Sequence, residues 1–580
     1  MSITTPRLAC RLHIAGIPGK DAEQKCLADE KDMEQLTQSG KLRWIKWIAA
    51  LLLLIMFAVG IATTFSYGMA WDEGLEKEIL LSNIREYAAL FHQEHKVDIL
   101  IKSALVGKIS ESVERDHGMA AYYPFFPVYA AISSQPLASM YAWHIYTFCI
   151  FFIGVAAVMM ILKELFSNPL IWFGGTLSYF LTPRFFAESH YNNMDLTFIS
   201  IILGMLLFLI KTARNPSWKN LIPYAFFSGL LMNCRTPGIA VWAFCGFFLV
   251  AFQVIHRASC VTYVKIIGGF ILSIVVYLML TPASWGNPIE FLQYCLDNAT
   301  HYTQWDKVIM YNGNMIQPGL NGLPYSYLPK WILMTVPEYV MMLFACSCAT
   351  FGIQLAKRAL RIVKKQSVPP LSDKDYFTGM LLLLFWMPFL FLVCQSPTLV
   401  LYNGWRHCYF LYAPIILVFL YTLEPDGNSN RRAFISSRIR KPLLCGVLIL
   451  GMLTTTVDLI HFHPYEYVYF NRIARSTLDI QGFEGDYWNV SVIEAARRFE
   501  AEHYQGKKLK VALMVDAWGG QEEAILNSDK LQIVDGPEAD YYLFTTSALN
   551  NKLLTQGFKL ISGVEIDGYL ISGVYVGEGD

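Results

Sequence analysis

Long apolar stretches, separated by polar segments of which 66–141 and 283–330 are the longest, follow one another from residue 44 to residue 460. A helix needs about 20 mainly apolar residues to cross a bilayer, because each residue adds only about 1.5 Å of length. Two of the stretches, 170–182 and 220–234, are short enough to be tilted or re-entrant. We predict a polytopic α-helical membrane protein with about eleven transmembrane helices, over residues 44–65, 142–164, 170–182, 195–211, 220–234, 239–256, 264–282, 331–354, 376–395, 405–422 and 442–460.

Basic residues gather in alternate connections between these stretches, and the positive-inside rule places such clusters in the cytoplasm. With eleven spans every cluster falls on one side, so residues 1–43 are predicted to be a cytoplasmic N-terminal segment. The external side then carries the loop 66–141, the turn 183–195, the loop 283–330 and all residues after 462. The clusters are Lys41, Arg43 and Lys46; Lys211, Arg214 and Lys219; His256, Arg257 and Lys265; Lys357, Arg358, Arg361, Lys364 and Lys365; and Arg431, Arg432, Arg438, Arg440 and Lys441.

The hydrophobic pattern changes after the last apolar stretch. Short alternating runs replace long apolar ones, which is typical of strands that bury one face. We therefore divide the chain into a transmembrane module, residues 44–462, and a small external α/β domain, residues 463–580. The expected strands are 510–516, 541–546 and 569–576, with a helix near 494–499.

Composition agrees with a chain that lies mostly in an apolar solvent. Hydrophobic residues make up 54% of the sequence and charged residues only 16%, whereas soluble domains carry about 25% charged residues. The formal net charge is zero, so no basic field would attract nucleic acid. The 12 cysteines form no CxxC pair and no zinc-binding spacing.

Trp71-Asp72-Glu73, just after the first apolar stretch, is the leading candidate for chemistry. Ionisable residues beside a membrane are costly, so they mark candidate functional sites. One interpretation is an ordinary helix N-cap, with Asp72 capping and carboxylates in the first turn. The other is a carboxylate that takes part in catalysis.

Three further polar groups lie on the predicted external side. Arginine and histidine offer the donors that suit phosphate oxygens. The structural alternatives are a solvated turn, an aromatic and basic interface anchor, and an arginine that extends to the membrane surface. His461 and His463 could ligate a metal, but a plain junction is favoured. The three groups are the turn 183–195 with Arg184, Glu188, His190, Asn193 and Asp195; Arg406 with His407; and Arg235.

Taken together, these motifs resemble the GT-C superfamily of membrane glycosyltransferases, most closely the branch of protein O-mannosyltransferases and aminoarabinose transferases. The matching segments are Asp72-Glu73, Pro-Arg-Phe-Phe-Ala-Glu-Ser-His-Tyr-Asn-Asn-Met-Asp at 183–195, Gly-Trp-Arg-His-Cys-Tyr-Phe-Leu-Tyr-Ala-Pro at 404–414 and His-Pro-Tyr-Glu-Tyr-Val-Tyr-Phe-Asn at 463–471. The resemblance covers residues 44–490. It implies transfer of a sugar from a polyprenyl-phosphate donor to an acceptor hydroxyl, with inversion, on the external face. The expected location is a bacterial inner membrane, with the active site facing the periplasm.

Roles for individual residues follow from this resemblance. Asp72 is the expected general base, because an attacking hydroxyl must lose its proton, and Glu73 is expected to support it. Arg184, Arg235, Arg406 and His407 are candidates for binding the donor phosphate. Glu188, His190, Asn193 and Asp195 are candidates for positioning the sugar or holding the loop. No metal is assigned, although the carboxylates could instead share a divalent cation.

Two other functions are compatible with the same features. A transporter or flippase for lipid-linked sugars would share the spans and the basic groups, but transporters more often have short loops on both faces and broken helices in matching halves. A membrane scaffold without activity is the third interpretation. The long external loops and the terminal domain favour an enzyme acting at the membrane surface. The sequence leaves open which sugar is transferred and whether the acceptor is a glycan, a lipid or a protein.

Overall fold

The computed structural model describes residues 44–100, 108–300, 307–424, 437–514, 521–545 and 556–577. The described residues fall into two compact units, which divide between Val59 and Gly60. The described part of the first unit is helical and belongs to the apolar segment Trp44–Ser66. The second unit contains the other helices and all the strands of the described ranges.

Nine helices in the described ranges are long and apolar enough to cross a membrane, which confirms the predicted class of multi-pass helical membrane protein. The two shortest predicted spans are also helices, α7 (Pro169–Phe180) and α10 (Trp218–Cys234). With 12 and 17 residues, they reach about 18 and 26 Å, less than the hydrocarbon core of about 30 Å. The nine are Trp44–Ser66, Pro136–Leu165, Asp195–Arg214, Pro237–Ile255, Cys260–Leu280, Glu338–Val363, Asp373–Gln395, Arg406–Leu423 and Ile439–Phe462.

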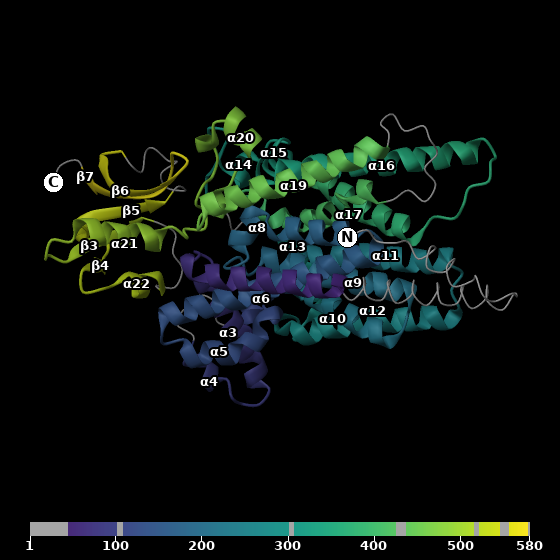
Figure 1. The fold of residues 1–580 in the computed structure, drawn as a ribbon. Helices are drawn as coiled ribbons and strands as arrows, with labels where there is room; N and C mark the ends of the chain where they lie inside the picture. Colours follow the sequence, from purple (N-terminus) through teal and green to yellow (C-terminus); the bar gives the residue numbers. More distant parts are fainter. Residues whose placement is uncertain are drawn as a thin grey trace, which may run out of the picture. The chain divides into compact units, whose positions relative to one another are not determined.

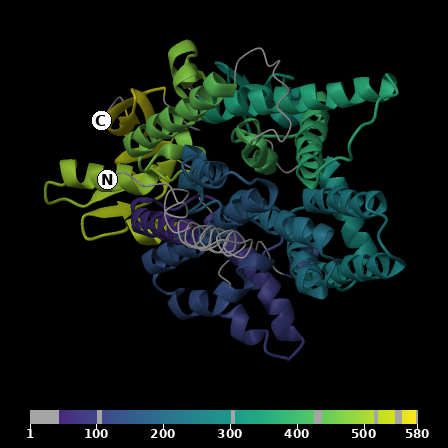
Figure 2. The ribbon, with the colours of Figure 1, turned by 45° about the vertical axis from the view of Figure 1, so that its right-hand side comes forward.

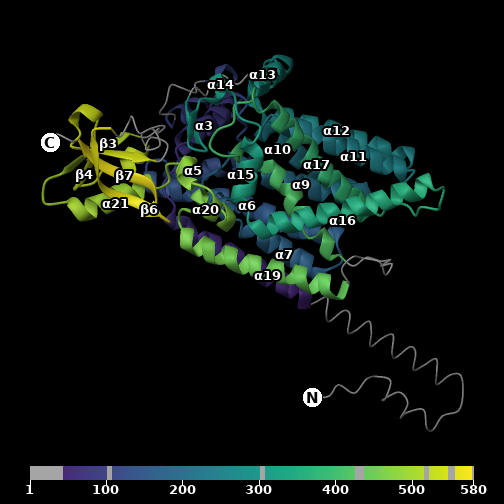
Figure 3. The ribbon, with the colours of Figure 1, turned by 90° about the horizontal axis from the view of Figure 1, so that it is seen from above.

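Helix α9 (Asp195–Arg214) is the most enclosed of the long helices, together with the segment Arg406–Leu423. It packs between α6 (Pro136–Leu165) and α10, and α10 packs in turn against α12 (Cys260–Leu280) (Figures 1 and 3). Gly154 of α6 lies so close to Ser200 of α9 that an added Cβ would be 2.8 Å from the Ser200 hydroxyl. Small residues at such crossings let helix backbones approach closely in a membrane.

The loop after the first span contains α3 (Glu73–Ala89), α4 (His95–Asp98), the 3-10 helix η4 (Ala120–Phe125) and α5 (Phe126–Ile132). Apolar residues of α3, including Leu80, form one core with Tyr122 and Phe125 of η4 and with Trp143 of α6. This core packs the middle of α3 against the first turns of α6. It therefore fixes the position of Asp72, which precedes α3.

The C-terminal residues form the small α/β domain that was predicted. Its five-stranded sheet has the order β4-β3-β5-β7-β6, in which β3 runs parallel to β4 and β5 and the remaining pairs are antiparallel. Helix α21 (Val492–His503) packs on β5, β6 and β7. The strands are β3 (Leu509–Met514), β4 (Leu531–Ile533), β5 (Tyr541–Thr545), β6 (Phe558–Ile566) and β7 (Tyr569–Gly577).

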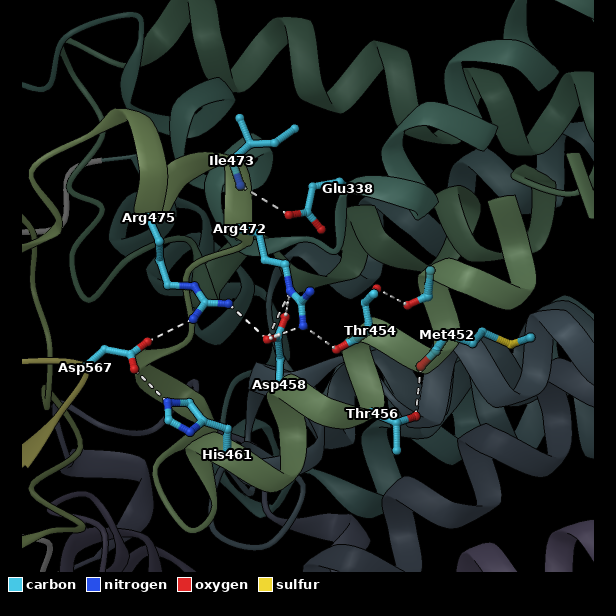
Figure 4. A network of polar contacts seen from close by, with 11 residues as sticks. Glu338, Met452, Thr454, Thr456, Asp458, His461, Arg472, Ile473, Arg475 and Asp567 are labelled. Atoms are coloured by element: carbon cyan, nitrogen blue, oxygen red, sulfur yellow. Dashed lines mark hydrogen bonds and ion pairs between the residues drawn. The ribbon is translucent and has the colours of Figure 1, made fainter. Parts of the chain in front are cut away.

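An ion-pair network joins this domain to the end of α19 (Ser437–Phe462), and Figures 1 and 2 show the yellow strands beside the green end of that helix. Asp458 of α19 accepts hydrogen bonds of 3.0 Å from both Arg472 and Arg475 (Figure 4). Arg475 also donates at 2.8 Å to Asp567, in the β6–β7 turn, and His461 lies 2.6 Å from the other oxygen of Asp567. The apolar core of the domain continues into Tyr67 and Tyr191 of the membrane module, so the domain is packed against that module.

Candidate functional site

Asp72 and Arg406, which are 334 positions apart, meet in an ion pair: Nη1 of Arg406 donates to Oδ2 of Asp72 at 2.9 Å. The side chain of Asp72 is 23% exposed and that of Arg406 only 7%. Asp72 occupies the N-cap position of α3, but its side chain makes no capping hydrogen bond. The simple capping interpretation therefore does not describe this residue, whose carboxylate faces the guanidinium.

The turn before Arg406 explains how the guanidinium reaches the site. Asn403 and Gly404 both have positive φ, 56° and 70°, a conformation that asparagine and glycine tolerate best. The guanidinium of Arg406 then lies over the Trp488 ring, 4.6 Å from its centroid. Its buried Nε has no hydrogen-bond partner within the described structure. The side chain is held in place yet keeps a donor for another ligand.

Arg235 brings a second guanidinium to this place, from the turn between α10 and α11 (Pro237–Ile255). It forms an ion pair with Asp195, at the start of α9. Burial, and then the positive charge of Arg406, lower the pKa of Arg235, so the two guanidinium groups lie within electrostatic range of each other. His407 is within range of both. Two guanidinium groups that lie this close to each other favour the binding of an anion nearby.

Arg184 is directed elsewhere. Its Nε donates to the carbonyl of Tyr469 at 2.9 Å, its Nη1 lies 3.5 Å from the Tyr487 hydroxyl, and the side chain is almost fully buried. Glu188 lies beside it and accepts hydrogen bonds from Tyr409 and Tyr487 at 2.7 and 3.1 Å. Burial raises the pKa of Glu188, although these hydrogen bonds oppose the effect. Arg184 thus belongs to a buried network and not to the group around Asp72.

His190 and Asn192 hold the turn between α7 and α9. The ring nitrogens of His190 lie 3.0–3.2 Å from the backbone carbonyls of Gly60, Phe186 and Ala187. Burial lowers the pKa of His190 to about 4, so its ring is neutral. Asn192 bridges Glu188 and Asp195 through hydrogen bonds of 2.7 and 3.2 Å.

Two other predicted positions in this turn face the site. Asp195 pairs with Arg235. Asn193 lies beside Glu76, a residue of α3, and its amide donates a weak hydrogen bond of 3.9 Å to the sulfur of Met119. The polar turn 183–195 therefore divides into an inner part that holds the fold and an outer part beside Asp72.

Glu73 is completely buried and fully engaged. It accepts hydrogen bonds from the Ala70 amide at 3.0 Å and from Lys77 at 3.2 Å, and His144 of α6 lies 2.6 Å from its Oε1. Burial would raise the pKa of Glu73, but the charges of His144 and Lys77 outweigh burial and lower it. These contacts tie α3 to α6, a supporting role. Neither partner was predicted, although Lys77 follows Glu73 by four residues and His144 interrupts an apolar span, and both features are visible in the sequence.

Glu76 and His117 are further residues of this region that were not predicted. Glu76 follows Asp72 by one helical turn, and its backbone amide donates to the Asp72 carbonyl at 3.0 Å. Burial raises the pKa of Glu76 to about 7, although the nearby His117 opposes the effect. His117 lies 3.1 Å from Glu114; burial lowers its pKa, but Glu114 and neighbouring carboxylates outweigh burial and raise it. The spacing of four residues between Asp72 and Glu76 could have revealed the first of these.

Glu484 is another residue that was not predicted. It accepts a hydrogen bond from the Gly404 amide at 3.2 Å and so supports the turn that carries Arg406. Burial raises its pKa to about 7, although Gly404 and Arg406 oppose the effect.

Across the described ranges, no three His, Cys, Asp or Glu side chains are grouped so that they could hold a metal ion. His461 and His463 pair with different acids, Asp567 and Glu466. That arrangement fits the junction interpretation of these two histidines.

Neither a protein-family model nor a curated protein sequence matches the chain. Solved structures do match. ArnT from Cupriavidus metallidurans bound to undecaprenyl phosphate is 12% identical, with a TM-score of 0.47, over 91% of this chain and 98% of ArnT. The same protein in the apo state is 11% identical, with a TM-score of 0.45, over 93% and 98%. The arabinofuranosyltransferase AftD from Mycobacteria is 12% identical, with a TM-score of 0.42, over 91% of this chain but only 40% of AftD.

These neighbours are GT-C membrane glycosyltransferases, the class that the sequence motifs resemble. With identities of 11–12% and TM-scores below 0.5, the likeness by itself assigns neither a family nor an activity to this chain.

Proposed function

We propose that the protein is a membrane glycosyltransferase that moves a sugar from a polyprenyl-phosphate donor to an acceptor hydroxyl with inversion. Asp72 acts as the general base, and Arg406 and Arg235, with His407 beside them, bind the donor phosphate. One observation carries the proposal: the expected base and an expected phosphate ligand, far apart in the sequence, are in direct contact at 2.9 Å.

The chemistry explains why this pair could suffice. A lipid phosphate is a good leaving group, and preorganised cations stabilise the charge that grows on it. The acceptor hydroxyl must instead lose a proton, for which a carboxylate within hydrogen-bonding reach is suited. Arg406 contacts Asp72 through Nη1, and its Nε has no partner in the described ranges. It can therefore bind a phosphate oxygen while the base stays beside it.

The depth of the group in the membrane fits a lipid-linked donor. Arg406 opens the span Arg406–Leu423, Asp195 opens α9, and Asp72 follows the end of the first span by six residues. All three therefore lie at span ends, where the phosphate of a membrane lipid also lies. The predicted topology puts this end on the external face, and we propose the periplasmic side of a bacterial inner membrane.

The test compares cells that lack the protein with cells that carry Asp72→Asn. Both should accumulate the same polyprenyl-phosphate sugar, which identifies the donor, and neither should form the glycosylated product. Asp98→Asn, which changes an exposed carboxylate paired with Arg85, should behave as wild type. Full product formation by Asp72→Asn would refute the role of Asp72. A flippase would instead leave the sugar attached to its lipid in every strain.

A further inference from the structure

Glu76 is a buried carboxylate beside the proposed catalytic group, and one of its oxygens is unused. The residue is only 4% exposed, and Oε2 has no hydrogen-bond partner in the part of the chain that the structure describes. Burying an unpaired acceptor costs free energy, and most buried polar groups in native folds have a partner. This oxygen therefore marks a place where a ligand could supply the missing donor.

Other buried carboxylates of the second unit show that the fold can satisfy such groups. Glu73 and Glu188 each have three partners. Asp486 accepts from the Val490 and Ser491 amides at 3.2 and 3.0 Å and from the Ser491 hydroxyl. Glu424 also has an oxygen without a partner in the described ranges, but it lies after the opposite end of the span Arg406–Leu423. Among these carboxylates, Glu76 is the one beside Asp72 with an oxygen that has no partner in the described ranges, although buried oxygens of Glu86, Glu94 and Asp116, elsewhere in the loop after the first span, also have none.

The groups around Glu76 come from several segments that meet at the proposed site. Asp72 precedes it by one turn of α3, His117 and Glu114 come from the loop after the first span, and Asn193 comes from the turn before α9. Arg235, one of the proposed phosphate ligands, is within electrostatic range. Glu76 therefore lies beside the proposed site, one helical turn of about 5.4 Å from the proposed base Asp72.

We propose that Glu76 accepts a hydrogen bond from a hydroxyl of the transferred sugar and so makes the site select glycosylated lipid over bare polyprenyl phosphate. This inference rests on the proposed function. Once deprotonated, a carboxylate only accepts hydrogen bonds, and sugar hydroxyls are the donors that a glycosyl donor carries. A site with a buried polar group rejects ligands that leave the group unpaired.

The experiment measures binding to the full-length protein in lipid nanodiscs. The probes are undecaprenyl phosphate and undecaprenyl phosphate carrying mannose, glucose or arabinose. At pH 8, above the pKa of about 7 of Glu76, wild type should bind at least one glycosylated lipid about tenfold or more tightly than the bare lipid, since a hydrogen bond to a charged group is worth about that factor. In Glu76→Leu the ratio of the two affinities, glycosylated over bare lipid, should fall to about twofold or less. The affinity for bare undecaprenyl phosphate should be unchanged.

Two further variants keep the test sharp. Glu78→Leu alters an equally buried carboxylate on another face of α3, and its ratio should match wild type. Glu76→Gln retains a carbonyl acceptor without charge, and its ratio should lie between that of wild type and one. This variant replaces Glu76→Leu as the test if the leucine variant does not fold.

The outcomes separate this inference from the proposed function. An unchanged ratio in both Glu76 variants overturns the inference alone, and so does a wild-type protein that prefers no glycosylated probe. Failure of wild type to bind bare undecaprenyl phosphate overturns the proposed function as well.

Discussion

Two groups of polar residues lie close together in this protein and differ in how completely they are paired. The outer group comprises Asp72, Glu76, Asp195, Arg235 and Arg406. The inner group comprises Arg184, Glu188, His190, Tyr409 and Tyr487. In the inner group both oxygens of Glu188 are bonded and both nitrogens of His190 face carbonyls, although Nη2 of Arg184 has no partner in the described structure.

Within the described ranges the outer group is left partly unpaired, at Arg406 Nε and Glu76 Oε2. It is also the group that keeps some exposure, at Asp72 and Arg235. A set of buried polar groups that satisfies itself specifies a fold, whereas donors and acceptors left open are available to a ligand. The comparison therefore separates residues that hold the module together from residues that are proposed to act on a substrate.

The largest effect is expected where the outer group would lose its base. Asp72→Asn keeps the size of the side chain but removes its basicity, so the rate of sugar transfer should fall by about 100-fold or more. The melting temperature should stay close to that of wild type, because Asp72 is partly exposed. Transfer is measured with lipid extracted from cells lacking the protein. A normal rate would place Asp72 with the structural residues.

Loss of a phosphate ligand should come next. Arg406→Ala removes a charge-assisted hydrogen bond worth about 1.5–3 kcal/mol, so the affinity for undecaprenyl phosphate should fall about 10-fold to 100-fold. Binding in nanodiscs measures this loss. Arg184→Ala is the matched change in the inner group and should lower the melting temperature. The folded fraction of this variant should bind undecaprenyl phosphate with the affinity of wild type. Equal losses of affinity in both variants would contradict the division between the groups.

A smaller effect is expected from a single hydroxyl of the inner group. Tyr409→Phe removes the 2.7 Å hydrogen bond to Glu188 and leaves a buried carboxylate short of one donor, at a cost of about 1–3 kcal/mol. Thermal unfolding in detergent should show a lower melting temperature. The transfer rate per folded molecule should be unchanged, and a specific loss of rate would assign Tyr409 to the site.

The smallest effect concerns the pH dependence of stability. The pKa of Glu76 is raised to about 7 in the fold, so the folded state holds its proton more tightly than the unfolded chain does. The cost of ionising Glu76 therefore grows as pH rises from about 4.5 to about 7. Glu76→Gln removes this cost, and its melting temperature should exceed that of wild type more at pH 8 than at pH 5. If the difference in melting temperature between the variant and wild type does not change with pH, the pKa of Glu76 is not raised in the folded state.

Much of the fold could be predicted from the sequence, because the insertion of a segment into a membrane depends on the summed hydropathy of its own residues. Whether a stretch of about 20 residues crosses a bilayer is set by its own composition, and the long apolar stretches were recognised for that reason. Strands β3, β5 and β7 likewise carry their own alternating pattern, whereas β4 and β6 of the same sheet were not predicted. Asp72, Arg235 and Arg406 stood out as charged residues at span ends, where such residues are costly.

Only the tertiary structure decided which of these residues meet. The contact of Asp72 with Arg406, the engagement of Glu73 by His144, and the burial of Arg184 depend on how helices rotate and pack. A single sequence carries no record of those rotations, since residues on one helix face can be turned toward several partners. The sequence by itself therefore determined which segments enter the membrane and which polar residues remain at its surface, and packing determined which of those residues are open to a ligand.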